Sequence, residues 1–125
     1  MKKQISTAGA PAAIGTYSQA VEAGGMVFIS GQLPVDPATG NFVENDIEKL
    51  TRRSLDNLKA ILAEVGLTMD NVVKTTVFLA DMADFAAMNS VYATYFEGVA
   101  PARSAVEVKR LPKDARIEIE AIAVR

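Results

Sequence analysis

The chain has 125 residues, half of them hydrophobic, and a net charge of −2. This length predicts a single domain, residues 1–125, with enough apolar side chains for a core of its own. The absence of Cys and His excludes disulfides, thiolate catalysis, Ser-His triads and most zinc sites, so any proton transfer must use carboxylates, Tyr, Lys or bound water.

The first third of the chain predicts an irregular arm followed by a β-hairpin. Residues 5–13 are interrupted by a Gly and a Pro and favour irregular structure. Strands are predicted over 18–23 and 26–30, joined at Gly24-Gly25, because glycines supply the positive φ angles of a two-residue turn. Residues 26–30 are apolar on both faces, which is typical of a strand covered on both sides.

Residues 45–65 give the clearest helical signal in the chain. Their apolar side chains recur at helical spacing, with charged residues on the opposite face. Asn45 and Glu48 have the spacing of a capping box, and Gly66 is placed to end the helix. The apolar stripe predicts that this helix lies on a sheet.

The second half predicts a strand over 72–79 and a helix over 82–97 that Asp81 caps. Two further strands, 104–108 and 117–124, close the chain. The order is therefore ββαβαββ, a mixed sheet with two helices packed on one face. No third helix is available for the other face.

Four apolar residues do not fit a face open to water, and they predict an oligomer. They lie in the strands at 26–30 and 117–124, and are Val27, Ile29, Ile122 and Val124. We therefore expect other copies of the chain to cover the second face. Their number does not follow from this pattern.

Arg103 and Glu118 stand out in the last two strands. If these strands lie close in one sheet, a guanidinium and a carboxylate could line one cavity. A guanidinium binds a small carboxylate through two parallel hydrogen bonds, which Lys does not provide. Glu118 could orient or deprotonate water, with a pKa raised by burial and lowered by a nearby Arg. The alternatives are an ordinary salt-bridge arginine and a solvated strand carboxylate.

Three other positions have both a structural and a functional interpretation. Tyr17 is either an aromatic lid or a hydroxyl directed into a pocket. Asn89, on the second helix, is either a polar edge residue or an amide turned toward a ligand. Gly31 either forms a bulge or lets a backbone N–H approach a substrate oxygen.

The charge pattern gives no reason to expect nucleic acid or a membrane as a partner. The only basic cluster lacks interleaved aromatic residues and is interpreted as a solvated turn: Lys109, Arg110, Lys113 and Arg116. No apolar run is long enough to span a bilayer. Residues 4–15 are small and polar rather than the apolar core of a signal peptide, so we expect a cytoplasmic protein.

Most of the chain closely resembles the RidA family (YjgF/YER057c/UK114), the enamine/imine deaminases. The resemblance is carried by seven stretches: 10–19, 28–32, 54–60, 73–79, 102–108 (ARSAVEV), 111–115 (LPKDA) and 117–123 (IEIEAIA). It implies a chorismate-mutase-like α/β (α+β) fold and a homotrimer with pockets between subunits.

The resemblance also implies a reaction without a cofactor or metal. Reactive 2-imino acids, such as 2-iminobutanoate and 2-iminopropanoate, would be hydrolysed to 2-keto acids and ammonia. Their enamine precursors, such as 2-aminoacrylate, would come from pyridoxal-phosphate-dependent serine/threonine dehydratases.

By resemblance, Arg103 matches the arginine that binds the substrate carboxylate, and Glu118 matches the acid that positions water. Tyr17 matches a pocket position, and its hydroxyl is a second candidate for supplying the proton to leaving ammonia. These three residues are the predicted catalytic set.

Ser30, Gly31 and Asn89 match substrate-binding positions by resemblance. Ala105 is a departure, because many members of the family have Cys there. Its backbone N–H can still bind a carboxylate, but activities that depend on a thiol are not expected.

Two other classes of function stay open from the sequence. One is a non-catalytic trimeric sensor of small carboxylates, which would bind keto acids tightly without imine turnover. The other is RNA cleavage or translation inhibition, an activity linked to the family's older names. The acidic charge balance argues against the second.

Overall fold

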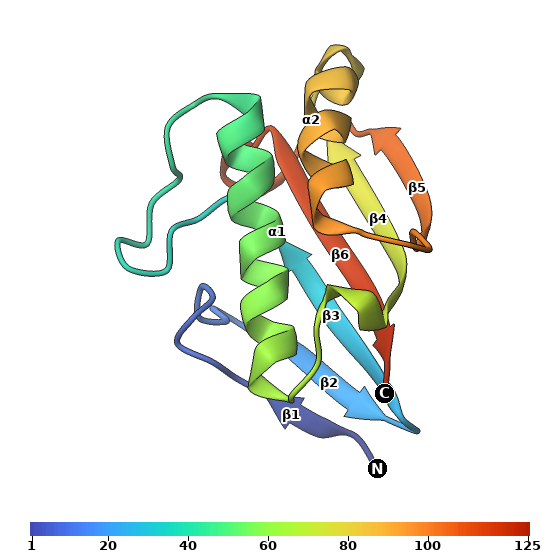
Figure 1. Ribbon diagram of the computed structural model, residues 1–125. Helices are drawn as coiled ribbons and strands as arrows, with labels where there is room; N and C mark the ends of the chain where they lie inside the picture. Colours follow the sequence, from blue (N-terminus) through green and yellow to red (C-terminus); the bar gives the residue numbers. More distant parts are fainter.

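A computed structural model describes residues 1–125, and its six strands form one twisted sheet (Figure 1). The strands are β1 (Lys3–Ile5), β2 (Ala20–Ala23), β3 (Met26–Gln32), β4 (Val72–Leu79), β5 (Ala102–Glu107) and β6 (Ile117–Val124). Their order in the sheet is β1-β2-β3-β6-β4-β5. Only β4 and β5 pair in parallel, and the other neighbours are antiparallel. The last strand of the sequence therefore lies near the centre of the sheet.

The long helix α1 (Ile47–Glu64) follows the predicted segment closely. Asp46, rather than Asn45, is its N-cap, and the Asp46 carboxylate accepts a hydrogen bond from Lys49 N at 3.0 Å. The predicted capping box is therefore wrong by one residue. Gly66 follows the helix with a φ of 75°, the left-handed conformation expected of a glycine at this position.

The second helical segment is more broken than predicted. A 3₁₀ turn at Met82–Asp84 leads into α2 (Phe85–Tyr92), and another at Ala93–Tyr95 follows it. Asp81 caps the first turn as expected, through a hydrogen bond from Ala83 N to its carboxylate. The α-helix is therefore about half the length that the apolar spacing suggested.

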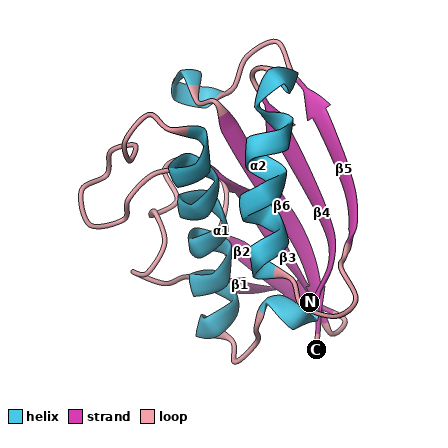
Figure 2. Cartoon of the chain, turned by 45° about the horizontal axis from the view of Figure 1, so that its top comes forward, coloured by secondary structure: helices cyan, strands magenta, loops and turns pink.

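Both helices lie on the same face of the sheet (Figure 2), as predicted. Fully buried side chains of α1, β4 and β6 meet there, among them Leu55, Leu58, Ile61, Val77, Ile117 and Ile119. Burying one such side chain stabilises the fold by about 1.5–3 kcal/mol. Neither helix combines the length and the apolar character needed to cross a membrane.

The edge strand β1 is a correction to the predicted order ββαβαββ, which becomes βββαβαββ. β1 has only three residues and pairs with β2. Just one of them, Ile5, is buried. So short a segment carries no period-2 pattern. No element was predicted for residues 3 and 4, and the predicted irregular arm began at Ile5.

The opposite face of the sheet is covered by no element of the chain. In β6, buried residues alternate with Glu118, Glu120, Ile122 and Val124, which lie on this open face. Phe28 is 39% exposed there, paired in register with Ile122. The prediction of an uncovered apolar face is thus confirmed for β6. It was wrong for Val27 and Ile29, which are buried beneath the helices.

Candidate functional site

Arg103 lies in β5 and turns its guanidinium under α2. Its Nη1 donates a hydrogen bond to the Asn89 side-chain oxygen at 2.7 Å. The guanidinium carbon lies 4.8 Å from the centre of the Tyr92 ring and 5.3 Å from that of Phe85. Aromatic faces at these distances attract a cation and hold the planar group in place.

No carboxylate of the chain pairs with Arg103, although the side chain is partly buried. The four ion pairs of the protein involve other residues, and Asn89 is the only hydrogen-bond acceptor that Arg103 reaches. A guanidinium has five N–H donors, so most of them have no protein partner. A partly buried cation with unused donors is suited to binding an external anion.

Tyr92 is itself fixed from the sheet side. Its hydroxyl hydrogen-bonds the Thr75 hydroxyl at 2.7 Å, inside the core. Burial raises the pKa of Tyr92, while the Thr75 bond and the Arg103 charge oppose that rise. Tyr92 therefore stays a neutral phenol that supports the guanidinium.

Glu118 lies near the start of β6, on the open face. Its side chain is partly buried, forms no hydrogen bond and has no ion-pair partner within the chain. Burial raises the pKa of the Glu118 carboxyl above its ordinary value, and the charge of Glu120 raises it further. The predicted lowering of this pKa by a nearby arginine does not occur within one chain.

Gly31 makes room for the Glu118 side chain. A Cβ atom at position 31 would stand 2.7 Å from the Glu118 carboxyl carbon, closer than real Cβ contacts allow. The pairing of β3 with β6 shifts register between Ile29 and Gln32, so Gly31 lies in a bulge, as one of its two interpretations predicted. The bulge and the missing side chain together set where the carboxylate lies.

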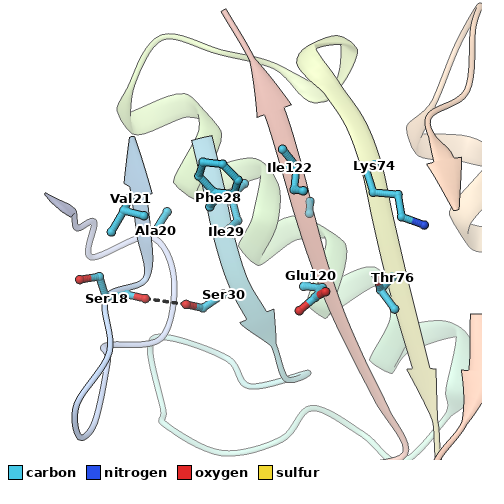
Figure 3. A pocket seen from close by; sticks show the side chains of 11 residues that line it. Ser18, Ala20, Val21, Phe28, Ile29, Ser30, Lys74, Thr76, Glu120 and Ile122 are labelled. Atoms are coloured by element: carbon cyan, nitrogen blue, oxygen red, sulfur yellow. Dashed lines mark hydrogen bonds between the residues drawn. The ribbon is translucent and has the colours of Figure 1, made fainter. Parts of the chain in front are cut away.

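Ser30 lies on the open face directly before Gly31, and it is bonded to the loop that carries Tyr17. The Ser30 hydroxyl donates to Ser18 O at 2.6 Å, which joins β3 to the loop before β2 (Figure 3). Tyr17, one residue earlier in that loop, is 53% exposed, and its hydroxyl accepts a hydrogen bond from Ile14 N at 3.2 Å. The hydroxyl proton is therefore free to donate elsewhere.

The predicted residues thus form two groups on opposite faces of the sheet. Arg103 pairs in register with Thr75, which is buried beneath the helices, whereas Glu118 pairs with Phe78 on the open face. Directly paired side chains point to the same face. One chain therefore does not bring Arg103 and Glu118 into one cavity, and their strands are separated by β4.

The first group contains Arg103 and Asn89, with Ala105 two residues further along β5 on the same face. The second contains Ser30, Gly31 and Glu118, and Tyr17 directly precedes Ser18, which is bonded to Ser30. We call them the arginine half-site and the glutamate half-site. No group of three or more acidic side chains converges as a metal site would require.

A hollow on the open face has a volume of about 390 Å³ (Figure 3). It is lined by Phe28, Ser30, Lys74, Thr76, Glu120 and Ile122, among others. Arg103 and Glu118 do not line it. The hollow is a broad depression of an uncovered sheet rather than an enclosed substrate pocket.

Sequence reasoning missed the aromatic support of Arg103. Phe85, Asn89 and Tyr92 are spaced i, i+4 and i+7, which places them on one helical face, and this signal was available. By sequence alone, Phe85 and Tyr92 fit an apolar stripe of the helix that packs on the sheet. The contact between this helical face and a guanidinium depends on the parallel pairing of β4 and β5. The sequence did not predict that pairing.

The relationship to known proteins is strong over the whole chain. Residues 7–125 match the family described as Endoribonuclease L-PSP. The chain belongs to this family, which includes the RidA proteins, and the predicted family is confirmed. It is 55% identical to the 2-iminobutanoate/2-iminopropanoate deaminase of Salmonella typhimurium, covering 100% of this chain and 99% of that protein.

Two other family members extend this comparison. The deaminase of the same name from Mus musculus is 50% identical, over 100% of this chain and 93% of its own length. The crystal structure of Escherichia coli TdcF with bound serine has a TM-score of 0.94 and 50% identity, with 98% of each chain covered. The fold class predicted from the sequence is therefore confirmed.

Proposed function

We propose that this protein hydrolyses 2-imino acids, with 2-iminobutanoate and 2-iminopropanoate as the expected substrates, to 2-keto acids and ammonia. This proposal depends above all on the Arg103 guanidinium. It is partly buried, is held by Asn89 and two aromatic rings, and has no carboxylate partner in the chain. It supplies the donors that the carboxylate of such a substrate requires.

Relatives support the same enzyme class. Those at 50–55% identity over their full length include proteins named 2-iminobutanoate/2-iminopropanoate deaminase. The enamine/imine deaminase class predicted from the sequence is thereby confirmed. The TdcF structure with bound serine supports a small amino or imino acid as the ligand, because serine and a 2-imino acid both carry a carboxylate next to a nitrogen-bearing carbon.

The proposed active site is shared between copies of the chain. Arg103 and Glu118 lie on opposite faces of one sheet, so they meet only if the arginine half-site of one copy docks against the glutamate half-site of the next. A ring of three copies would contain three such sites, consistent with the homotrimer expected from the family resemblance. The uncovered apolar residues of the open face support this assembly.

In the proposed reaction, Arg103 holds the substrate carboxylate, and backbone N–H groups near Gly31 and Ala105 assist. Water held by Glu118 adds to the carbon of the C=N bond and forms a carbinolamine. The C–N bond then breaks, with a proton passed to the leaving ammonia through Glu118 or Tyr17. A raised pKa suits Glu118 to this exchange, because a general acid–base works best near the operating pH.

Enamines and imines of this kind are products of pyridoxal-phosphate-dependent serine/threonine dehydratases, and we propose that the protein acts next to such enzymes in the cytoplasm. The pyridoxal cofactor would belong to the dehydratase. This protein would consume the product released from it.

The structure adds an argument against RNA as the substrate. In the basic cluster at 109–116, Arg110 pairs with Asp114, and Arg116 pairs with Asp84. Only Lys109 and Lys113 then carry charge without a partner. Two lysines give little electrostatic attraction to a phosphate backbone in a protein of net charge −2.

The test couples the purified protein to threonine dehydratase and follows formation of 2-ketobutyrate from the released imine. We expect the rate to exceed that in buffer and in an equal amount of the Arg103→Ala variant. No acceleration by the wild-type protein would reject the proposal. Tight binding of 2-ketobutyrate without acceleration would identify the carboxylate sensor instead.

A further inference from the structure

The loop that carries Tyr17 has little backbone structure of its own. Residues 6–19, between β1 and β2, form no helix or strand. Within residues 6–18, Tyr17 N to Gly15 O, at 3.1 Å, is the only hydrogen bond between backbone groups. A loop of this length has many accessible conformations, so something else must fix its shape.

The side chain of Gln19 supplies that constraint. It is buried, with 3% of its surface exposed. Its oxygen accepts a hydrogen bond from Thr7 N at 2.7 Å, and its nitrogen donates to Thr7 O, Ala10 O and Pro11 O at 3.0, 3.2 and 2.8 Å. A side-chain amide has two N–H donors, so the three carbonyls share them and neither donor is left unpaired.

Gln19 also joins the loop to the glutamate half-site. Its backbone oxygen accepts a hydrogen bond from Ser30 N at 3.0 Å, next to the bond from the Ser30 hydroxyl to Ser18 O. The Gln19 side chain thus holds residues 7–11. The backbone oxygens of residues 18 and 19 accept hydrogen bonds from Ser30 of β3. Tyr17 lies in the short span between these two anchored points.

We infer that Gln19 is a positioning residue for the reaction, because it fixes the loop in which Tyr17 directly precedes Ser18, the residue bonded to Ser30 of the glutamate half-site. The inference depends on the proposed role of Tyr17 in the site. Gln19 itself is buried beneath the loop and does not contact the substrate.

The first test is a double-mutant cycle between Gln19→Met and Tyr17→Phe. Met has nearly the shape of Gln without its hydrogen bonds. We expect kcat/KM to fall about tenfold for Gln19→Met, since a displacement of about 1 Å in a catalytic group costs up to about 10²-fold. In the Tyr17→Phe background the same change should have less than about a threefold effect, because the group it positions has been removed.

The second test does not depend on activity. Hydrogen exchange of the backbone amides at 8–18 should be faster in Gln19→Met than in wild type, while exchange in α1 should be unchanged. Asn71→Ala is the matched control, since Asn71 also uses both ends of a side-chain amide, bonding Thr68 N and Val124 O at the opposite end of β6 from Glu118. It should lower stability without changing kcat/KM or loop exchange.

Three results would overturn the inference: wild-type kcat/KM in Gln19→Met, an equal loss in both Tyr17 backgrounds, or unchanged exchange of residues 8–18. If Gln19→Met does not fold, Gln19→Glu serves in its place, because it keeps the acceptor for Thr7 N and loses the donors. Full activity of Tyr17→Phe alone would instead contradict the assigned role of Tyr17, and the exchange experiment would still test the ordering of the loop.

Discussion

Arg103 shows at the level of one residue why a cation is kept partly buried without a carboxylate. Burial of an unpaired charge is costly, so the fold offsets that cost with the Asn89 oxygen and the faces of Tyr92 and Phe85. These groups orient the guanidinium but leave most of its donors unused. The residue is therefore organised for a ligand rather than for stability alone.

Arg103→Lys should raise KM much more than it lowers stability. An ammonium keeps the charge but loses the planar, two-point bond to a carboxylate. Loss of one charge-assisted hydrogen bond predicts a KM about 10- to 100-fold higher in the coupled imine assay. Arg110→Lys, at the exposed pair with Asp114, is the control and should behave as wild type. An unchanged KM in Arg103→Lys would contradict two-point binding.

Glu118→Gln should abolish most activity and, in an Arg103→Ala background where no arginine of the next copy faces it, stabilise the protein above mildly acidic pH. The folded-state pKa of Glu118 lies above its ordinary value of 4.5, so folding favours the protonated form and stability is lost as pH rises through the raised pKa. The introduced glutamine cannot ionise, so the variant has no such loss of stability. Its denaturant midpoint should match that of the Glu118 protein below about pH 4 and exceed it by more as the pH rises.

Activity of Glu118→Gln should fall about 10²- to 10⁴-fold, the usual contribution of an acid–base group. The imine assay measures activity in the otherwise wild-type protein, and urea titrations from pH 4 to 8 measure stability in the Arg103→Ala background. A Glu118→Gln change that lowers stability at pH 8 in that background would contradict the raised pKa of this carboxylate.

At the level of elements, the bulge in β3 controls where Glu118 lies. Gly31→Ala should displace the carboxylate, because the new Cβ would overlap the Glu118 side chain, and kcat/KM should fall about tenfold or more. In a Glu118→Gln background the added methyl should cost little further activity. Equal losses in both backgrounds would show that Gly31 acts through something other than Glu118.

Some elements were predictable from sequence because several signals agreed. In α1 the apolar spacing, the acidic cap region and Gly66 all point to the same helix, and its bounds were correct to within two residues. The alternation in β6 gave its bounds of Ile117–Val124 directly. β1 and the 3₁₀ turns around α2 were missed, since three-residue elements carry too short a pattern.

The site residues could be chosen from the sequence, but their relative position could not. Alternation places Glu118 on one face of its strand, and nothing in the sequence relates that face to the one that Arg103 occupies. The relative position of these two faces depends on β5, which pairs in parallel with the edge of β4 that faces away from β6. This pairing joins segments that are far apart in the sequence.

At the level of the whole molecule, the open face is the surface through which we expect copies to associate. Phe28→Glu places a charge among its exposed apolar side chains and should shift the protein from about 40 kDa, for three 13.3 kDa copies, toward a monomer in sedimentation velocity. Ala63→Glu, on an exposed part of α1, should leave the mass unchanged. A Phe28→Glu protein with the wild-type mass would exclude this face from the interface.

The most direct measurement of the shared site mixes two inactive variants, Arg103→Ala and Glu118→Gln, and reassembles them from denaturant at equal concentrations. Each variant keeps the half-site that the other lacks. With random assembly, about one quarter of the sites receive both intact residues, so we predict about one quarter of wild-type activity from the mixture. Activity no higher than that of the separately reassembled variants would contradict a site built from two copies.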